Sequence, residues 1–171
     1  LGKLITFGVL PTDAQTDYGY IESSKNHKDG AYKVEEFVEK PDLNTAQLYL
    51  EQGNYLWNSG MFMFKASTLI SELNVHSPDM VKAIGSSVDK ASKDLDFIRL
   101  EKQAFASSPS GSIDYSLMEK SNKVVMVPLD AGWSDIGSFS ALYDIGTKDK
   151  NRNVIHGDVI TQDMTNTYIN A

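Results

Sequence analysis

The chain has 171 residues, of which 41% are hydrophobic and 23% charged, values typical of a globular protein with one hydrophobic core. Its net charge of -7 disfavours a nucleic-acid partner, and no stretch approaches the ~20 apolar residues of a membrane helix. The absence of cysteine excludes disulfides and thiolate metal sites, and it fits a cytoplasmic protein.

The first forty residues predict three strands. Residues 4–10 form a short apolar run of the kind found in buried strands. A strand pattern resumes at 18–21 and returns at 32–38, after turn-forming residues at 26–30, which predicts a hairpin. Pro41 ends this hairpin, because proline has no amide proton to give to a strand ladder.

The middle of the chain predicts helices and one aromatic strand. Residues 42–52 carry apolar side chains at helical spacing and end before Gly53, a common helix terminator. Residues 57–65 predict a strand entered through a turn at 58–60, and Ser67 is expected to cap the helix that follows. Further helices are expected from Pro78 and over 94–105 and 113–120.

The last part of the chain changes character. A β-branched strand at 124–127 and a short helix at 139–145 complete the α/β pattern. From Asn151 onward, short β pieces alternate with Gly, Asp and Asn. We therefore expect one domain over 1–150, an α/β sheet with helices on both faces, and the start of a C-terminal β region over 151–171.

Three polar side chains come shortly after predicted strands: Lys40, Asn58 and Asp135. In open α/β sheets, ligands bind beyond the carboxyl ends of the strands. This placement predicts that the three residues belong to one site.

Lys40 and its neighbour Glu39 suit a phosphorylated sugar. Lys40 is a compact cation that can meet a phosphate oxygen, and Glu39 can accept hydrogen bonds from hydroxyl groups. Asn58 can donate and accept, which suits a vicinal diol. The alternatives are two solvated charges at a strand end and an ordinary turn before a core strand.

Asp135 is the candidate metal ligand. Mg²⁺ prefers hard oxygen ligands and is usually held by one or two carboxylates together with substrate phosphates. The alternative is that Asp135 caps the helix near Phe139 or forms a turn, although Ser138 is the better cap candidate.

Two further residues are candidates for the same site. Asp114 lies where a serine-glycine loop becomes a helix, and its alternative role is a first-turn acid that the helix dipole favours. Gly19 could bring a backbone amide to a ligand, but a glycine between tyrosines is equally a bulge.

No residue pattern marks a nucleophile. This fits a reaction in which a sugar phosphate attacks a nucleotide phosphorus directly with its own anionic oxygen. Catalysis then depends on alignment and on charge neutralisation by magnesium and lysine.

These motifs together resemble a known family. The segments that carry the resemblance are Gly19-Tyr20-Ile21, Phe37-Val38-Glu39-Lys40-Pro41, Trp57-Asn58-Ser59-Gly60-Met61-Phe62, Ile113-Asp114-Tyr115-Ser116-Leu117-Met118-Glu119-Lys120 and Gly132-Trp133-Ser134-Asp135-Ile136-Gly137-Ser138. They look like the bacterial mannose-1-phosphate guanylyltransferases, a branch of the sugar nucleotidyltransferases, over nearly the whole chain. The resemblance implies a partial Rossmann-like sheet followed by a β-helix-like tail.

The resemblance also implies an activity and roles for the site residues. The reaction joins GTP and mannose 1-phosphate into GDP-mannose and pyrophosphate, requires Mg²⁺ and belongs to cytoplasmic sugar-nucleotide synthesis. Lys40 would act in catalysis at the sugar phosphate, and Asp135 would ligate magnesium. The residues implied to bind the sugar are Gly19, Glu39, Asn58 and Asp114.

The chain departs from the family in two ways. Phe139 stands where the family usually has tryptophan, which affects only local packing. The family's glycine-rich loop, with its arginine and lysine, belongs to a segment that these residues do not include. We therefore expect this chain to be the C-terminal, sugar-phosphate-binding portion of a catalytic domain and to be inactive alone.

Other functions remain open at this point. The chain could belong to a non-catalytic sugar-phosphate-binding or regulatory relative, or to a nucleotidyltransferase for another sugar or base. A third alternative is an assembly module whose β tail forms homo-oligomers.

Overall fold

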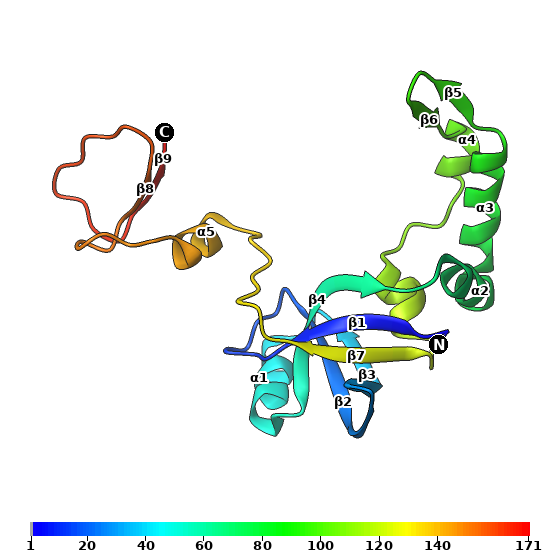
Figure 1. The fold of residues 1–171 in the computed structure, drawn as a ribbon, viewed down its shortest axis with the longest axis horizontal. Coiled ribbons are helices and arrows are strands. Elements are labelled where there is room, and N and C mark those ends of the chain that lie inside the picture. Colours follow the sequence, from blue (N-terminus) through cyan, green and yellow to red (C-terminus); the bar gives the residue numbers. More distant parts are fainter. Residues whose placement is uncertain (1) are drawn as a thin grey trace. The chain divides into compact units, whose positions relative to one another are not determined.

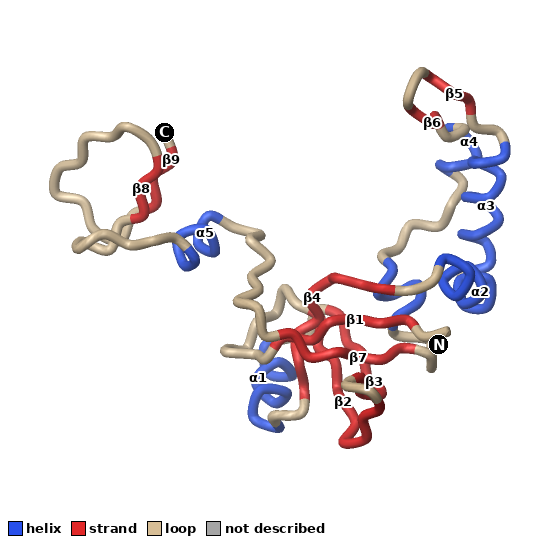
Figure 2. Tube along the Cα trace, in the orientation of Figure 1, coloured by secondary structure: helices blue, strands red, loops and turns tan. Residues whose placement is uncertain are grey.

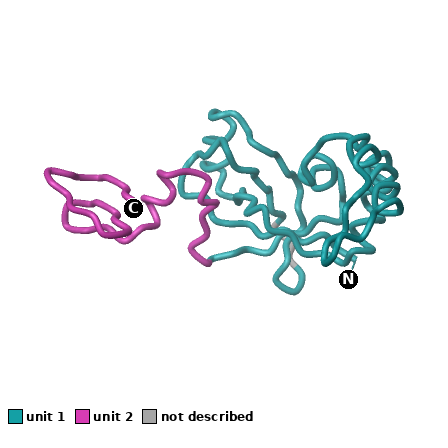
Figure 3. The backbone as a smooth tube through the Cα atoms, turned by 90° about the horizontal axis from the view of Figure 1, so that it is seen from above, with its two compact units in different colours: residues 1–130 teal, residues 131–171 magenta. Residues whose placement is uncertain are grey.

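Figure 1 shows the computed structural model, which describes residues 2–171 and the side chains of these residues except 25–27. The chain forms two compact units, residues 1–130 and 131–171 (Figure 3), and each is described by itself. Along the chain, the boundary between the units falls between Asp130 and Ala131, whereas the composition of the sequence changes near Asn151. The assignment of domains at 1–150 and 151–171 stays a prediction.

The first unit is built on a closed five-stranded sheet in the order β1-β4-β2-β3-β7. β1 and β7 run parallel, and the other adjacent pairs are antiparallel. The strands are β1 (Leu4–Val9), β2 (Gly19–Lys28), β3 (Ala31–Glu39), β4 (Tyr55–Met63) and β7 (Val124–Leu129).

The expected mixture of strands and helices is confirmed, and the sheet is closed on itself. The hairpin of β2 and β3 contains register shifts after Glu22 and Ser23. Such bulges bend a strand and increase its twist. The beginning of β3 accordingly reaches β7, where Tyr32 pairs with Met126, and the sheet closes.

The core lies on the inner face of this sheet. Side chains alternate between the two faces of a strand, so that Leu4, Thr6 and Gly8 of β1 point the same way. Each large apolar side chain buried there stabilises the fold by about 1.5–3 kcal/mol. The buried core residues are Leu4, Ile21, Phe37, Leu117, Met118, Val124 and Met126.

The first helix, α1 (Leu43–Gln52), begins and ends as predicted. The Asp42 carboxylate accepts a hydrogen bond from the Thr45 amide at 2.9 Å, and Gly53 ends the helix at a φ of 71°. Tyr49 of α1 stacks on Tyr55 of β4, with ring centroids 3.8 Å apart. This contact packs α1 against the sheet.

A helical segment follows β4 (Figure 2), and two of its predicted features are wrong. It contains α2 (Ala66–His76), α3 (Pro78–Asp89), β5 (Ser92–Asp94), β6 (Phe97–Arg99) and α4 (Lys102–Ala106). Pro78 starts α3 as predicted, but Ser67 lies inside α2 and does not cap it.

The helix expected over 94–105 is replaced by the hairpin of β5 and β6. Leu95 has a φ of 53°, which suits a turn, and the Asp94 carboxylate pairs with Arg99 at 2.8 Å across the hairpin. Helix α4 begins only after Glu101, whose carboxylate accepts from the amides of Gln103 and Ala104. The apolar spacing therefore did not determine the local structure in this exposed segment.

The helix expected over 113–120 is a short π-helix, η1 (Asp114–Met118). Its Glu119 amide donates to the Asp114 carbonyl at 3.0 Å, a bond that spans five residues. Leu117 and Met118 are buried in the core. Because η1 is anchored by these two side chains, Asp114 is held at its first turn.

The second unit contains α5 (Phe139–Ile145), β8 (Val154–His156) and β9 (Tyr168–Asn170). Ser138 caps α5 as predicted, since its hydroxyl accepts from the Ala141 amide at 3.1 Å. β8 and β9 pair in parallel, while the β piece expected at 159–160 is not a strand. Within residues 2–171, no helix combines the length and the apolar character needed to cross a bilayer.

Candidate active site

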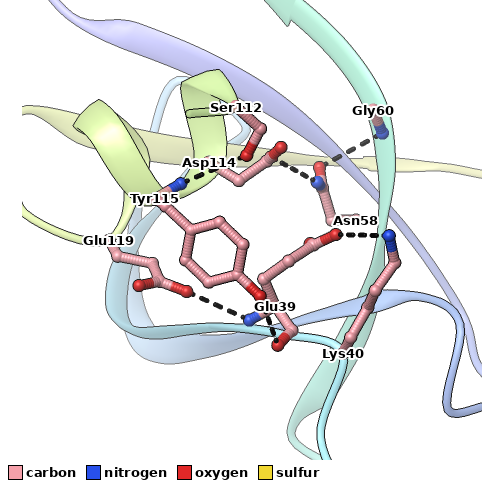
Figure 4. Close-up of polar contacts among 8 residues, drawn as sticks. All are labelled: Glu39, Lys40, Asn58, Gly60, Ser112, Asp114, Tyr115 and Glu119. Carbon is pink, nitrogen blue, oxygen red and sulfur yellow. Dashed lines mark hydrogen bonds and ion pairs between the residues drawn. The ribbon is translucent and has the colours of Figure 1, made fainter. Parts of the chain in front are cut away.

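The inner face of the closed sheet becomes polar beyond its apolar core. Gly19 of β2 pairs with Glu39 of β3, and Tyr20 of the same strand pairs with Trp57 of β4. This register brings Gly19 beside Asn58, which pairs in turn with Gly8 of β1. The result is one row of residues across four strands, part of which is shown in Figure 4.

Gly19 permits the close approach of two polar side chains. A Cβ atom on Gly19 would lie 2.6 Å from Glu39 Oε2 and 3.2 Å from the Cβ of Asn58. Any larger residue would have to displace Glu39. Glycine is therefore needed at position 19 because two side chains of the site lie close to it, and not because the chain turns there.

Asn58 lies inside β4, and the expected turn at 58–60 is a bulge within the strand. The pairing of β1 with β4 shifts between Thr6 and Gly8, and Gly60 has a φ of 72°. Bulges often re-aim a side chain next to a functional site. The turn was expected because the Asn-Ser-Gly residues are turn formers, but the flanking aromatic residues keep them in the strand.

Three partners hold the buried side chain of Asn58. Thr6 Oγ1 donates to Asn58 Oδ1 at 2.9 Å, and the Gly60 amide donates to the same oxygen at 3.2 Å. Asn58 Nδ2 donates to Asp114 Oδ1 at 3.2 Å. These bonds join β1, β4 and η1 at one point (Figure 4 shows the bonds from Gly60 and to Asp114).

Glu39 is held at the end of β3 by contacts to its backbone. Its amide donates to Glu119 Oε1 at 3.2 Å, and its carbonyl accepts from the Tyr115 hydroxyl at 3.5 Å. Its side chain is 12% exposed. Both partners come from η1 or the residue that follows it, so that η1 fixes the carboxyl groups of Asp114 and Glu39 near each other.

Lys40 follows directly in a left-handed backbone conformation, with a φ of 52°. This conformation is unfavourable for residues other than glycine and is often kept at functional sites. The Lys40 amide donates to the Tyr18 carbonyl at 3.2 Å. Its Nζ lies 3.6 Å from Glu39 Oε1, and the side chain remains more than half exposed.

The electrostatics of the site are unbalanced. Burial raises the pKa of the Glu39 carboxyl, and the nearby charge of Asp114 raises it further, while Lys40 opposes the increase. The site therefore offers carboxyl groups that lack full compensation, one buried amide and one exposed cation. Such a set can bind hydroxyl groups on its inner side and an anion beside Lys40.

The structure brings together five of the six residues that the sequence singled out: Gly19, Glu39, Lys40, Asn58 and Asp114. Their contacts come from strand register and from η1, not from the ends of parallel strands. The roles assigned to these residues stay predictions.

Asp135, the sixth, belongs to the second unit, which is described by itself. It is exposed on the loop before α5. A Cβ on Gly137 would lie 2.6 Å from Asp135 Oδ2, so the loop passes close to the carboxylate. In the part of the chain that the structure describes, no three His, Cys, Asp or Glu side chains gather as a metal site.

Sequence reasoning missed Thr6 and Glu119. Thr6 is a single polar residue within an apolar strand, and this was the available signal. Glu119 reaches the Glu39 amide because it follows a π-helical turn, and no sequence pattern predicts that turn.

The chain belongs to the nucleotidyl transferase family, whose model matches residues 2–152. It is 51% identical, over 168 residues, to the mannose-1-phosphate guanylyltransferase of Salmonella muenchen. It is 53% identical, over 167 residues, to the xanthan biosynthesis protein XanB of Xanthomonas campestris. These matches confirm the resemblance to mannose-1-phosphate guanylyltransferases. Each covers 98% of this chain, which spans about a third of either relative (36% and 35%).

Solved structures share the fold. A mannose-1-phosphate geranyltransferase from Thermus thermophilus matches with a TM-score of 0.76 and 33% identity, over 92% of this chain and 44% of that one. A mannose-6-phosphate isomerase from Helicobacter pylori matches with a TM-score of 0.70 and 36% identity, over 78% and 53% of the two chains. The fold is therefore a mixed α/β fold of the nucleotidyltransferase type.

Proposed function

We propose that this chain is the sugar-phosphate-binding part of a mannose-1-phosphate guanylyltransferase. The complete enzyme would convert GTP and mannose 1-phosphate into GDP-mannose and pyrophosphate. The observation that carries the proposal is the polar group formed by Glu39, Lys40, Asn58 and Asp114. It lies within a chain whose whole length is about half identical to enzymes of that name.

The contacts of these residues indicate which part of the substrate each of them would bind. Glu39 and Asp114 present carboxyl oxygens, and Asn58 presents an amide, so that this side of the group suits the hydroxyl groups of a hexose. Lys40 carries its cation on the exposed side, which suits the phosphate. The chain would thus bind mannose 1-phosphate through both its hydroxyl groups and its phosphate.

The proposed reaction is an in-line displacement. A phosphate oxygen of mannose 1-phosphate forms a bond to the α-phosphorus of GTP, and the bond from that phosphorus to the pyrophosphate oxygen breaks. No covalent enzyme intermediate is needed. Lys40 would hold the attacking phosphate in line and reduce its charge repulsion with the nucleotide.

Asp135 is the residue proposed to hold Mg²⁺. Its exposed carboxylate is the donor type that this ion prefers, and Mg²⁺ is usually held by one or two carboxylates together with substrate phosphates. When bound, the ion would neutralise phosphate charge. The donor chemistry of Asp135 therefore fits the ion.

Four further features belong to the proposal. The name guanylyltransferase supports GTP as the nucleotide. A cytoplasmic place in sugar-nucleotide synthesis is proposed because the chain has no cysteine. The parallel pair of β8 and β9 supports a β-helix-like tail, since such tails stack short parallel strands. Homo-oligomer formation through this tail is the fourth.

The test is an assay of the complete protein with GTP, mannose 1-phosphate and Mg²⁺. We expect Asp135→Ala to lower kcat by about a thousandfold, in the range seen when charge stabilisation of a transition state is removed. Asp158→Ala, which changes another exposed aspartate of the same unit, serves as the matched control. Thermal unfolding checks that both variants are folded.

Three outcomes would contradict parts of the proposal. Unchanged turnover in Asp135→Ala would remove this residue from the mechanism. Binding of mannose 1-phosphate without turnover by the wild-type protein would favour a non-catalytic relative. Turnover with another sugar phosphate or nucleotide, and not with these two, would change the substrate assignment.

A further inference from the structure

Thr6 is a buried polar residue on the apolar face of β1. Its side chain is fully buried, between the inward-facing positions of Leu4 and Gly8. A buried hydroxyl lowers stability unless it makes a hydrogen bond. The bond that Thr6 makes is directed at the candidate site, because its Oγ1 donates to Asn58 Oδ1 at 2.9 Å.

The partners of Asn58 determine which way its amide points. The backbone amide of Gly60 can only donate, so the Asn58 atom that it contacts at 3.2 Å is the oxygen. The carboxylate of Asp114 accepts, so the atom that faces it at 3.2 Å is the nitrogen. The assignment of oxygen and nitrogen therefore follows from the hydrogen bonds.

Thr6 and Gly60 together occupy the acceptor capacity of Asn58. A carbonyl oxygen has two lone pairs, and these two donors use both. One N–H of Nδ2 goes to Asp114, which leaves the other for a ligand. Sequence reasoning expected Asn58 to donate and accept, but in this arrangement it can only donate.

The remaining groups of the site define the chemistry of the matching ligand atom. Asp114, which accepts from Asn58, and Glu39, whose carboxyl group lies near that of Asp114, are carboxyl acceptors. A group placed between them and Asn58 must accept one hydrogen bond and donate another. A sugar hydroxyl does both, whereas a hydrogen or fluorine substituent in its place cannot donate.

We infer that Thr6 is a positioning residue, which holds Asn58 as a hydrogen-bond donor and so makes the site select one hexose hydroxyl as acceptor and donor together. This inference rests on the proposed function. It adds that the site recognises one particular sugar hydroxyl and that Thr6 positions Asn58 for that recognition. Thr6 itself does not contact the substrate, since it is covered by the core.

The test uses the complete enzyme as wild type, Thr6→Val and Thr6→Ser. Valine keeps the shape of threonine but removes the donor, and serine keeps the donor. We expect Thr6→Val to raise the KM for mannose 1-phosphate about tenfold, as for loss of one buried hydrogen bond, and to change the KM for GTP less than about twofold. Thr6→Ser should restore most of the affinity.

A second measurement uses mannose 1-phosphates in which each ring hydroxyl is replaced in turn by hydrogen or fluorine. One position should lose about tenfold or more in kcat/KM with both replacements in the wild type. That loss should shrink in Thr6→Val, because the two changes remove the same interaction. The wild-type panel also tests the inference if Thr6→Val does not fold.

The outcomes distinguish a failure of the role of Thr6 from a failure of the proposed function. The role of Thr6 is overturned if the wild-type enzyme turns over normally and any one of four results is obtained. These results are an unchanged KM in Thr6→Val, an equal rise in both KM values, no rescue by serine, and no sensitive hydroxyl. A wild type without turnover overturns the proposed function. Crystal structures of the three proteins then decide the role of Thr6. Loss of the contact between Asn58 and Asp114 in Thr6→Val alone supports it, and an unmoved Asn58 overturns it.

Discussion

Two glutamates of the first unit are both largely buried but have opposite environments. Glu72 of α2 is 8% exposed and bonds to Lys123 at 2.8 Å and Ser121 at 2.5 Å. Glu39, on the inner face of the sheet, has Lys40 only at 3.6 Å and a second carboxyl group, that of Asp114, nearby. The pKa of Glu72 is lowered, mainly by the bond from Lys123, whereas burial raises that of Glu39.

This difference separates a structural carboxylate from one available to a ligand. The fold supplies Glu72 with its hydrogen bonds and counter-charge, so that it joins α2 to the segment before β7. The compensation of Glu39 is incomplete, and a bound hydroxyl group or cation would complete it. Four predictions test this reading, from the largest expected effect to the smallest.

Glu72→Gln should destabilise the protein by about 2 kcal/mol, because it removes a charged hydrogen bond and leaves Lys123 without its partner. Since the folded pKa of Glu72 is lowered, its stabilising contribution is present above the usual carboxyl pKa and is lost as the pH falls through the folded value. Urea unfolding at neutral and acidic pH measures both effects. Glu51→Gln, an exposed change on α1, is the control, and equal losses in the two variants would contradict the structural role.

Gly19→Ala should impair binding of mannose 1-phosphate more than it lowers the stability of the protein. The new Cβ would lie 2.6 Å from Glu39 Oε2, and the flexible carboxyl group can move away at little cost in stability. We expect the KM for mannose 1-phosphate to rise about tenfold, as for the loss of one hydrogen-bonded contact. Gly85→Ala, in open space on α3, is the matched control, and steady-state kinetics that fail to distinguish the two would disprove the crowding argument.

Lys40→Gly should be more stable than Lys40→Ala by about 1 kcal/mol, because position 40 has a positive φ that glycine adopts without strain. Both variants should lose activity. Thermal unfolding of the pair, with turnover measured in parallel, checks this. If the alanine variant were equally stable, the backbone at Lys40 would not be strained in the free protein.

Glu39→Gln should stabilise the protein slightly at neutral pH while impairing activity. The folded pKa of Glu39 is raised, so that its ionised form opposes folding above that value and ceases to do so below the ordinary carboxyl pKa. The gain should therefore vanish in acid, opposite to the trend at Glu72. A constant difference across the pH range in thermal unfolding would refute the proposed burial of charge.

Much of this architecture could be predicted from residue patterns. The hairpin of β2 and β3 and the helix after Asp42 follow from local signals, namely turn residues, alternation and caps. The hairpin at 92–99 could not be predicted, because its apolar residues are exposed and pack little. Periodicity predicts structure where it reflects burial, and here it did not.

The candidate site was less accessible to sequence reasoning. Its residue types indicated a sugar phosphate, but the contacts depend on pairing between distant strands. The bulge at Asn58 and the bond from Thr6 require the register of β1 and β4, which the sequence does not display. For that reason Asn58 could be identified as a candidate while its hydrogen-bonding direction could not.

The π-helical turn at η1 makes the site sensitive to chain length. A deletion of one residue there would let an ordinary α-helical turn close in its place. Successive residues of an α-helix are about 100° apart around the axis. With Leu117 and Met118 kept in the core, the same deletion is expected to turn the carboxylate of Asp114 away from Asn58. The extra residue of η1 is thus what allows the buried core residues and the contact between Asp114 and Asn58 to coexist.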